Sequence, residues 1–173
     1  MKKSDSAKNL FSKNLSLLVL CAVLASLSVV LGKFLAINVT NSLRISFESL
    51  PILFAGLFLG PLYGALVGTV ADLVGCLIVG YSINPIITLG AATIGIISGI
   101  FSKSQKLGKT KKIFFGVFSA HIIGSMIIKT VGLYVYYSTP IGILALRLPI
   151  YILTASLESY VLYLISKKNV MKF

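Results

Sequence analysis

The sequence has few charged residues. Asp, Glu, Lys and Arg make up 12% of its 173 residues, whereas 57% of them are hydrophobic. A soluble globular protein of this size needs more polar surface, so the composition excludes that class. The mean hydropathy of +0.98 indicates an integral membrane protein instead.

Cysteine and histidine are scarce as well. Cys21 and Cys76 stand alone in apolar segments without CxxC spacing, which is typical of small buried side chains rather than of a metal site or a disulfide. His121 is the single histidine, and no HExxH, paired-aspartate or nucleophile motif is present. An intramembrane enzyme using His121, Asp72 and Glu158 is therefore a weak alternative. We predict that the protein is not an enzyme and carries no metal and no cofactor.

A phosphate-binding loop is also missing. Gly108-Lys109-Thr110 resembles the end of such a loop, but Lys103 stands where the first glycine is required. We expect no ATP site in this chain.

Apolar runs separated by turn-forming residues divide the chain into six segments, and a span of the membrane needs about 20 residues. We expect an all-α integral membrane protein, a single domain over residues 1–173 that forms a six-transmembrane-helix bundle. The spans are predicted at residues 15–37, 43–59, 62–79, 85–101, 113–137 and 143–165.

The net charge of +12 is concentrated in three segments. Twelve lysines lie in the tail of residues 1–13, in the loop of residues 101–113 and near the C-terminus, and the other connections hold none. With six spans these segments share one side of the membrane, which the positive-inside rule makes cytoplasmic. This distribution argues against nucleic acid as a partner and predicts a multi-pass protein of the bacterial plasma membrane, with both termini inside.

The remaining charges lie in or beside the spans, where each costs about 2.5–3.5 kcal/mol at a helix centre. They sum to +1 and are Lys33, Arg44, Glu48, Asp72, Lys129, Arg147 and Glu158. All but Glu158 fall in the outer half of the predicted bundle. They predict a polar pocket that opens outward, although snorkelling to the interface explains Lys33 or Arg44 equally well.

Helical spacing aligns several of these residues. Gly60, Gly64, Gly68 and Asp72 recur every four residues, so a row of small residues leads to Asp72. His121, Ser125 and Lys129 form a second row, and Arg147 and Glu158 lie about 20° apart on the last span. The last span therefore carries a polar track with Tyr151 and Thr154 on it.

Four motifs of the chain belong together: Leu31-Gly32-Lys33-Phe34, Leu43-Arg44-Ile45-Ser46-Phe47, Gly60-Pro61-Leu62-Tyr63-Gly64 and Ala71-Asp72-Leu73-Val74-Gly75. They resemble the folate-specific substrate-binding (S) subunits of energy-coupling factor (ECF) transporters. The resemblance covers almost the whole chain. It implies a membrane protein that binds a vitamin from outside. It also implies partners, namely a transmembrane coupling protein and two ABC-type ATPases.

The family carries an Ala-x-x-x-Ala motif on its first helix that contacts the coupling protein. The matching positions here are Cys21 and Ala25, with Ala22 and Ser26 alongside. Cysteine is small, so close packing of helices at this place is retained.

A folate ligand assigns roles to the polar residues. A pterin presents two neighbouring donors that a carboxylate accepts, and Asp72 is the first candidate, with Asn84 as helper. The two carboxylates of the glutamate tail need cations. The candidates are Arg147, Lys129, Arg44 and Lys33, and Tyr81 and His121 complete the predicted ligand-binding set. A subunit for riboflavin, thiamin or biotin, and a solitary proton-coupled carrier using Asp72 or Glu158, remain the alternatives.

Overall fold

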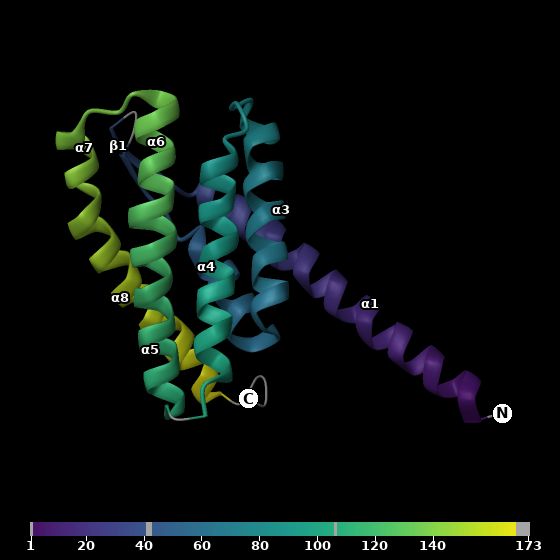
Figure 1. The fold of residues 1–173 in the computed structure, drawn as a ribbon. Helices are drawn as coiled ribbons and strands as arrows, with labels where there is room; N and C mark the ends of the chain where they lie inside the picture. The colour runs from purple at the N-terminus through teal and green to yellow at the C-terminus, as the bar shows by residue number, and fades with distance from the viewer. Residues whose placement is uncertain (1, 41–42, 106, 169–173) are drawn as a thin grey trace.

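The chain folds into a helical bundle with one short β-hairpin (Figure 1). The computed structural model describes the backbone of residues 2–40, 43–105 and 107–168, and side chains within 15–37, 45–105 and 107–168. The elements are α1 (Lys2–Val29), the π-helical turn η1 (Val30–Phe34), β1 (Ile37–Thr40), β2 (Leu43–Ile45), α2 (Ser49–Phe54), η2 (Ala55–Leu59, π-helical), α3 (Pro61–Val79), α4 (Pro85–Lys103), α5 (Lys109–Ala120), η3 (His121–Ile128, π-helical), α6 (Lys129–Tyr137), α7 (Ile141–Ala145) and α8 (Arg147–Lys167).

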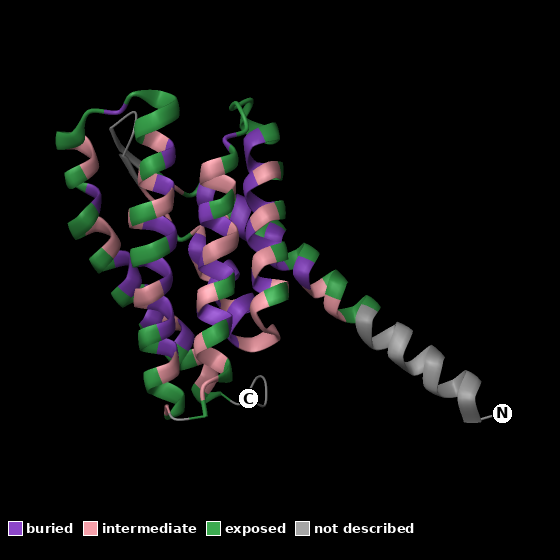
Figure 2. Cartoon of the chain, in the orientation of Figure 1, coloured by how far each residue is buried: buried purple, intermediate pink, exposed green. Residues whose placement is uncertain are grey.

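The predicted all-α membrane architecture is confirmed. Five helical stretches of the described chain are long and apolar enough to cross a membrane: Leu15–Phe34, Pro61–Val79, Pro85–Lys103, Lys109–Tyr137 and Ile141–Lys167. Buried residues face the centre of the bundle, whereas exposed ones cover its outer faces (Figure 2). The exposed residues include many large apolar side chains, as expected for a surface in contact with lipid.

The predicted span at residues 43–59 is the main departure. Residues 43–45 pair with β1 in an antiparallel hairpin, and the helical part is only Ser49–Leu59. Eleven residues rise about 16 Å, roughly half of the hydrocarbon thickness. The hairpin and this short helix together take the place of the predicted second span. The number of crossings and the side of the termini stay predictions.

The row of small residues on α3 packs against α4 in register. A Cβ added at Gly64 would collide with the backbone of Gly95, and one added at Gly68 with the backbone of Ala91. One turn further on, the hydroxyl of Thr88 on α4 reaches Asp72. Close packing of the two antiparallel helices therefore fixes where the Asp72 carboxylate lies.

The lysine-rich segments lie toward the bottom of Figure 1. The connection between α4 and α5 and the end of α8 form the lower end of the bundle, and the start of α1 projects away from it to the lower right. The hairpin, the end of α6 and α7 lie at the opposite end (Figure 1). This arrangement agrees with the charge distribution from which the cytoplasmic side was predicted.

Candidate functional site

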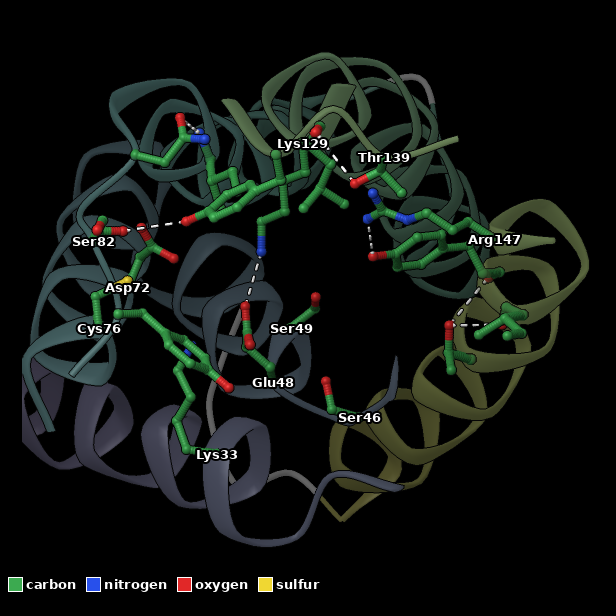
Figure 3. A pocket seen from close by; sticks show the side chains of 18 residues that line it. Lys33, Ser46, Glu48, Ser49, Asp72, Cys76, Ser82, Lys129, Thr139 and Arg147 are labelled. Atoms are coloured by element: carbon green, nitrogen blue, oxygen red, sulfur yellow. Dashed lines mark hydrogen bonds and ion pairs between the residues drawn. The ribbon is translucent and has the colours of Figure 1, made fainter. Parts of the chain in front are cut away.

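A cavity of about 330 Å³ lies among η1, α2, α3, α6 and α8, and its lining is rich in charge (Figure 3). This volume is within the range of small-molecule sites, about 300–1,000 Å³. Six of the predicted ligand-binding residues line it: Lys33, Asp72, Tyr81, Asn84, Lys129 and Arg147. These residues come from distant parts of the sequence, so the fold brings the predicted cluster together.

Asp72 lies on one side of the cavity (Figure 3). It is 6% exposed, and the hydroxyl of Thr88 donates a hydrogen bond of 2.6 Å to its Oδ2. Within the described residues no hydrogen bond to Oδ1 is seen. The carboxylate is thus oriented by α4 and can still accept hydrogen bonds from a ligand.

Arg147 lies on the opposite side (Figure 3). Its Nη2 donates a hydrogen bond of 2.6 Å to the Tyr151 hydroxyl one turn along α8. Although the side chain is 94% buried, with 6% exposure, Nη1 has no hydrogen-bond partner among the described residues. An unpaired guanidinium nitrogen at this depth is costly unless an anionic group of a ligand pairs with it.

Lys129 and Glu48 form an ion pair between these two sides, with 2.8 Å between Nζ and Oε1. Among the described lining residues there are three cations, Lys33, Lys129 and Arg147, and two carboxylates. The charges of these described residues sum to +1 and favour an anionic ligand.

Glycines make room for three of the charged side chains. A Cβ at Gly75 would lie 2.6 Å from Cε of Lys33, and one at Gly90 would lie 2.6 Å from Cγ of Lys129. Gly32 similarly faces Glu48, with 2.7 Å to its Oε2. Any larger residue at these positions would displace the charge beside it.

Asn84 has a structural role as well as a place in the lining. It caps α4, because its Oδ1 accepts hydrogen bonds from the backbone nitrogens of Ile86 and Ile87. Its Nδ2 donates to the carbonyl of Gly132 at 3.1 Å. These bonds occupy most of the amide, so Asn84 joins the start of α4 to α6.

Among the described residues, one predicted ligand residue is absent from the lining. His121 lies about two helical turns deeper than Lys129, where its Nε2 is 2.6 Å from Oε2 of Glu158. The prediction that His121 joins the ligand site is not supported by this geometry, because the imidazole is 3% exposed and absent from the cavity lining. The side chain of Arg44 lies outside the described residues.

Sequence reasoning missed several uncharged lining residues. They are Ser46, Ser49, Cys76, Ser82, Ile87, Leu133, Tyr137, Thr139 and Ile150. Tyr137 donates a hydrogen bond of 3.3 Å to the carbonyl of Ser82 and so links the end of α6 to the loop before α4. Nothing in the local sequence distinguishes Tyr137 from Tyr134 and Tyr136, and all three are exposed, so only the packing of α6 could identify Tyr137 as a lining residue.

The predicted partner contact on α1 divides into two faces. Cys21 and Ala25 are 1% and 4% exposed and belong to the protein core. Ala22 and Ser26 are exposed on the neighbouring face, where the Ser26 hydroxyl bonds the carbonyl of Ala22 at 2.9 Å. Of the four predicted contact positions, these two alone are accessible to a partner.

Comparisons with known proteins identify the family of the chain. Residues 12–166 match the family model of the ECF-type riboflavin transporter S component. An uncharacterised protein of Mycoplasma pneumoniae is 31% identical over 129 residues, which are 72% of this chain and 45% of that protein. The chain thus spans about half the length of this relative. The folate transporter FolT of Clostridium novyi is 26% identical over 133 residues, 76% of each protein.

Two solved structures share the fold. The crystal structure of FolT bound with folic acid superposes with a TM-score of 0.73 at 25% identity, covering 90% of this chain and 94% of the other. The S component of a bacterial ECF transporter gives a TM-score of 0.71 at 22% identity, with coverage of 90% and 95%. The second likeness shows the fold alone.

Proposed function

Since the chain belongs to the family of ECF-type transporter S components, we propose that it captures folate at the outer face of a bacterial plasma membrane. Members of this family are transporter subunits and not enzymes, and they bind vitamins. The main observation in favour of folate as the ligand is that Asp72 and Arg147 lie on opposite sides of one cavity (Figure 3).

The charges of the cavity favour folate over riboflavin and thiamin. Folate has a pterin with adjacent donors at one end and two carboxylates at the other. Asp72 suits the pterin, and Arg147, with Lys33 nearby in the lining, suits the glutamate. Riboflavin, which the family description names, has no carboxylate for Arg147 to bind, and thiamin is a cation. The likeness to FolT bound with folic acid supports the same choice.

The proposed partners are a transmembrane coupling protein and two ABC-type ATPases. The likeness of the whole chain to S components supports this assembly. The exposed small residues Ala22 and Ser26 are the proposed contact on α1, since small side chains let helices approach closely.

Uptake of radiolabelled folic acid tests the function. Cells that produce the chain with the coupling protein and both ATPases are expected to accumulate folate, and cells that produce the chain alone are not. Equal accumulation without the ATPases would favour a solitary carrier. Excess unlabelled riboflavin, thiamin and biotin should leave the accumulation unchanged, whereas excess unlabelled folic acid should abolish it.

Gly75→Ala is expected to weaken folic acid binding about fivefold, roughly 1 kcal/mol, because the added methyl group displaces the Lys33 side chain from the cavity. Binding is measured by calorimetry on the purified protein. In a Lys33→Ala background the same substitution should have little further effect. Gly142→Ala is the matched control, since a Cβ there meets nothing within 4 Å. A full fivefold loss in both backgrounds would contradict this role of Gly75.

Ala22→Leu combined with Ser26→Leu is expected to reduce copurification of the coupling protein at least several-fold and to leave folic acid binding intact. The larger side chains keep the partner helix from approaching closely. The control is Val23→Leu, on an exposed neighbouring position of α1. Normal copurification of the coupling protein with the double variant would show that the contact does not lie on this face of α1.

A further inference from the structure

Below the cavity the chain buries a second polar group that the proposed vitamin contacts do not use. Glu158 on α8 has no exposed surface, and His121 on η3 is 3% exposed. Nε2 of His121 lies 2.6 Å from Oε2 of Glu158, and Nδ1 lies 3.3 Å from the hydroxyl of Ser125. Polar groups buried in a membrane span cost free energy, so their presence calls for a role beyond filling space.

Contacts through Tyr151 join this pair to Arg147. The rings of His121 and Tyr151 lie 5.6 Å apart, centroid to centroid. The Tyr151 hydroxyl accepts the hydrogen bond from Nη2 of Arg147, whose guanidinium carbon lies 5.1 Å from the centroid of the same ring. Tyr151 therefore contacts both His121 and Arg147.

We propose that His121 and Glu158 are positioning residues that act through Tyr151 to fix the guanidinium of Arg147. Glu158 and Ser125 hold both nitrogens of the imidazole, so the ring presents a fixed surface to Tyr151. Tyr151 then holds Nη2 of Arg147, and Nη1, which has no partner in the described chain, stays available for an anionic group. This inference deepens the proposed function, because it concerns how the same cavity presents its cation to the ligand.

The sequence offers a direct way to observe this guanidinium. Arg44 and Arg147 are the two arginines of the chain. Labelling with nitrogen-15 arginine therefore yields guanidinium NMR signals from two residues, which Arg44→Lys assigns. In the ligand-free wild type we expect Arg147 to show separate Nη signals, because its hydrogen bond to Tyr151 restricts rotation.

The main variant carries His121→Leu together with Glu158→Met. Replacing both partners by apolar side chains leaves no unpaired buried charge, so the fold is expected to persist. The separate Nη signals should be lost in this variant and in Tyr151→Phe. Ser125→Ala is a milder variant that removes only the hydroxyl facing Nδ1 and should cause partial averaging. Ser156→Ala, an exposed serine of α8 bonded to its own helix, is the control and should change nothing.

Ligand binding supplies the second measurement. The main variant should bind folic acid about tenfold more weakly, the loss of one charge-assisted hydrogen bond. Pteroic acid, which lacks the glutamate tail, should bind within about twofold of the wild-type affinity. A role in stability alone would weaken both ligands equally.

Unchanged Arg147 signals in the folded main variant, or in Ser125→Ala if the main variant does not fold, overturn the inference. Failure of the proposed function gives a different result. In that case the wild type binds no folic acid, whereas the guanidinium signals, recorded without ligand, still decide whether His121 and Glu158 position Arg147.

Discussion

Arg147→Met is expected to weaken folic acid binding about 100-fold, roughly 2.7 kcal/mol. The guanidinium is buried and held by Tyr151, and its Nη1 has no hydrogen-bond partner among the described side chains, so it can meet a carboxylate without reorganisation. Methionine fills a similar volume but cannot pair with the anion, which would then lie desolvated beside Lys33 at best. Calorimetric titration of the purified variant measures the loss.

Lys167→Met is the matched control for Arg147→Met. It removes the same charge from the same helix at an exposed position near its other end. Folic acid binding should be unchanged in this control. The fragment p-aminobenzoylglutamate, which lacks the pterin, should lose affinity for Arg147→Met as strongly as folic acid does. A loss confined to pteroic acid would reverse the proposed orientation of the ligand.

Asp72→Asn is expected to weaken folic acid binding about 30-fold, roughly 2 kcal/mol. The hydroxyl of Thr88 donates to Oδ2 in the native protein. In the variant this hydroxyl should donate to the amide oxygen of the asparagine, so that the NH₂ group faces the cavity. Two donors of the pterin would then meet a donor instead of a carboxylate.

Asp72→Asn should weaken the binding of pteroic acid as much as that of folic acid, and it should leave the binding of p-aminobenzoylglutamate unchanged. Thr69→Val, a substitution on the same helix at a residue outside the cavity, is the control and should leave all three ligands unaffected. Equal loss for both fragments would mean that Asp72 acts on the fold and not on the pterin.

Much of the site could be predicted because membrane insertion makes charge conspicuous. Lys33, Asp72, Lys129 and Arg147 stand out in apolar segments, and the structure brings all four to one cavity. The glycine spacing that leads to Asp72 likewise predicted a close helix contact, which the structure shows between α3 and α4.

Depth and irregular backbone could not be predicted in the same way. His121 shares a row with Lys129 in a helical projection, but a projection does not show that its side chain is buried against Glu158 and absent from the cavity lining. The hairpin and the π-helical turns η1, η2 and η3 depend on tertiary contacts that the periodicity of an ideal helix does not encode. The split of the α1 motif into a buried and an exposed face also follows from packing, because all four residues are small.

The most direct test is calorimetric titration of folic acid into the detergent-purified chain, beside riboflavin, thiamin and biotin. The account predicts one-to-one binding of folic acid with a submicromolar dissociation constant and no comparable binding of the other three. Tight binding of riboflavin together with no binding of folic acid would contradict folate as the ligand, although it would agree with membership of the family. Binding of none of the four would contradict the account of the cavity as a vitamin site.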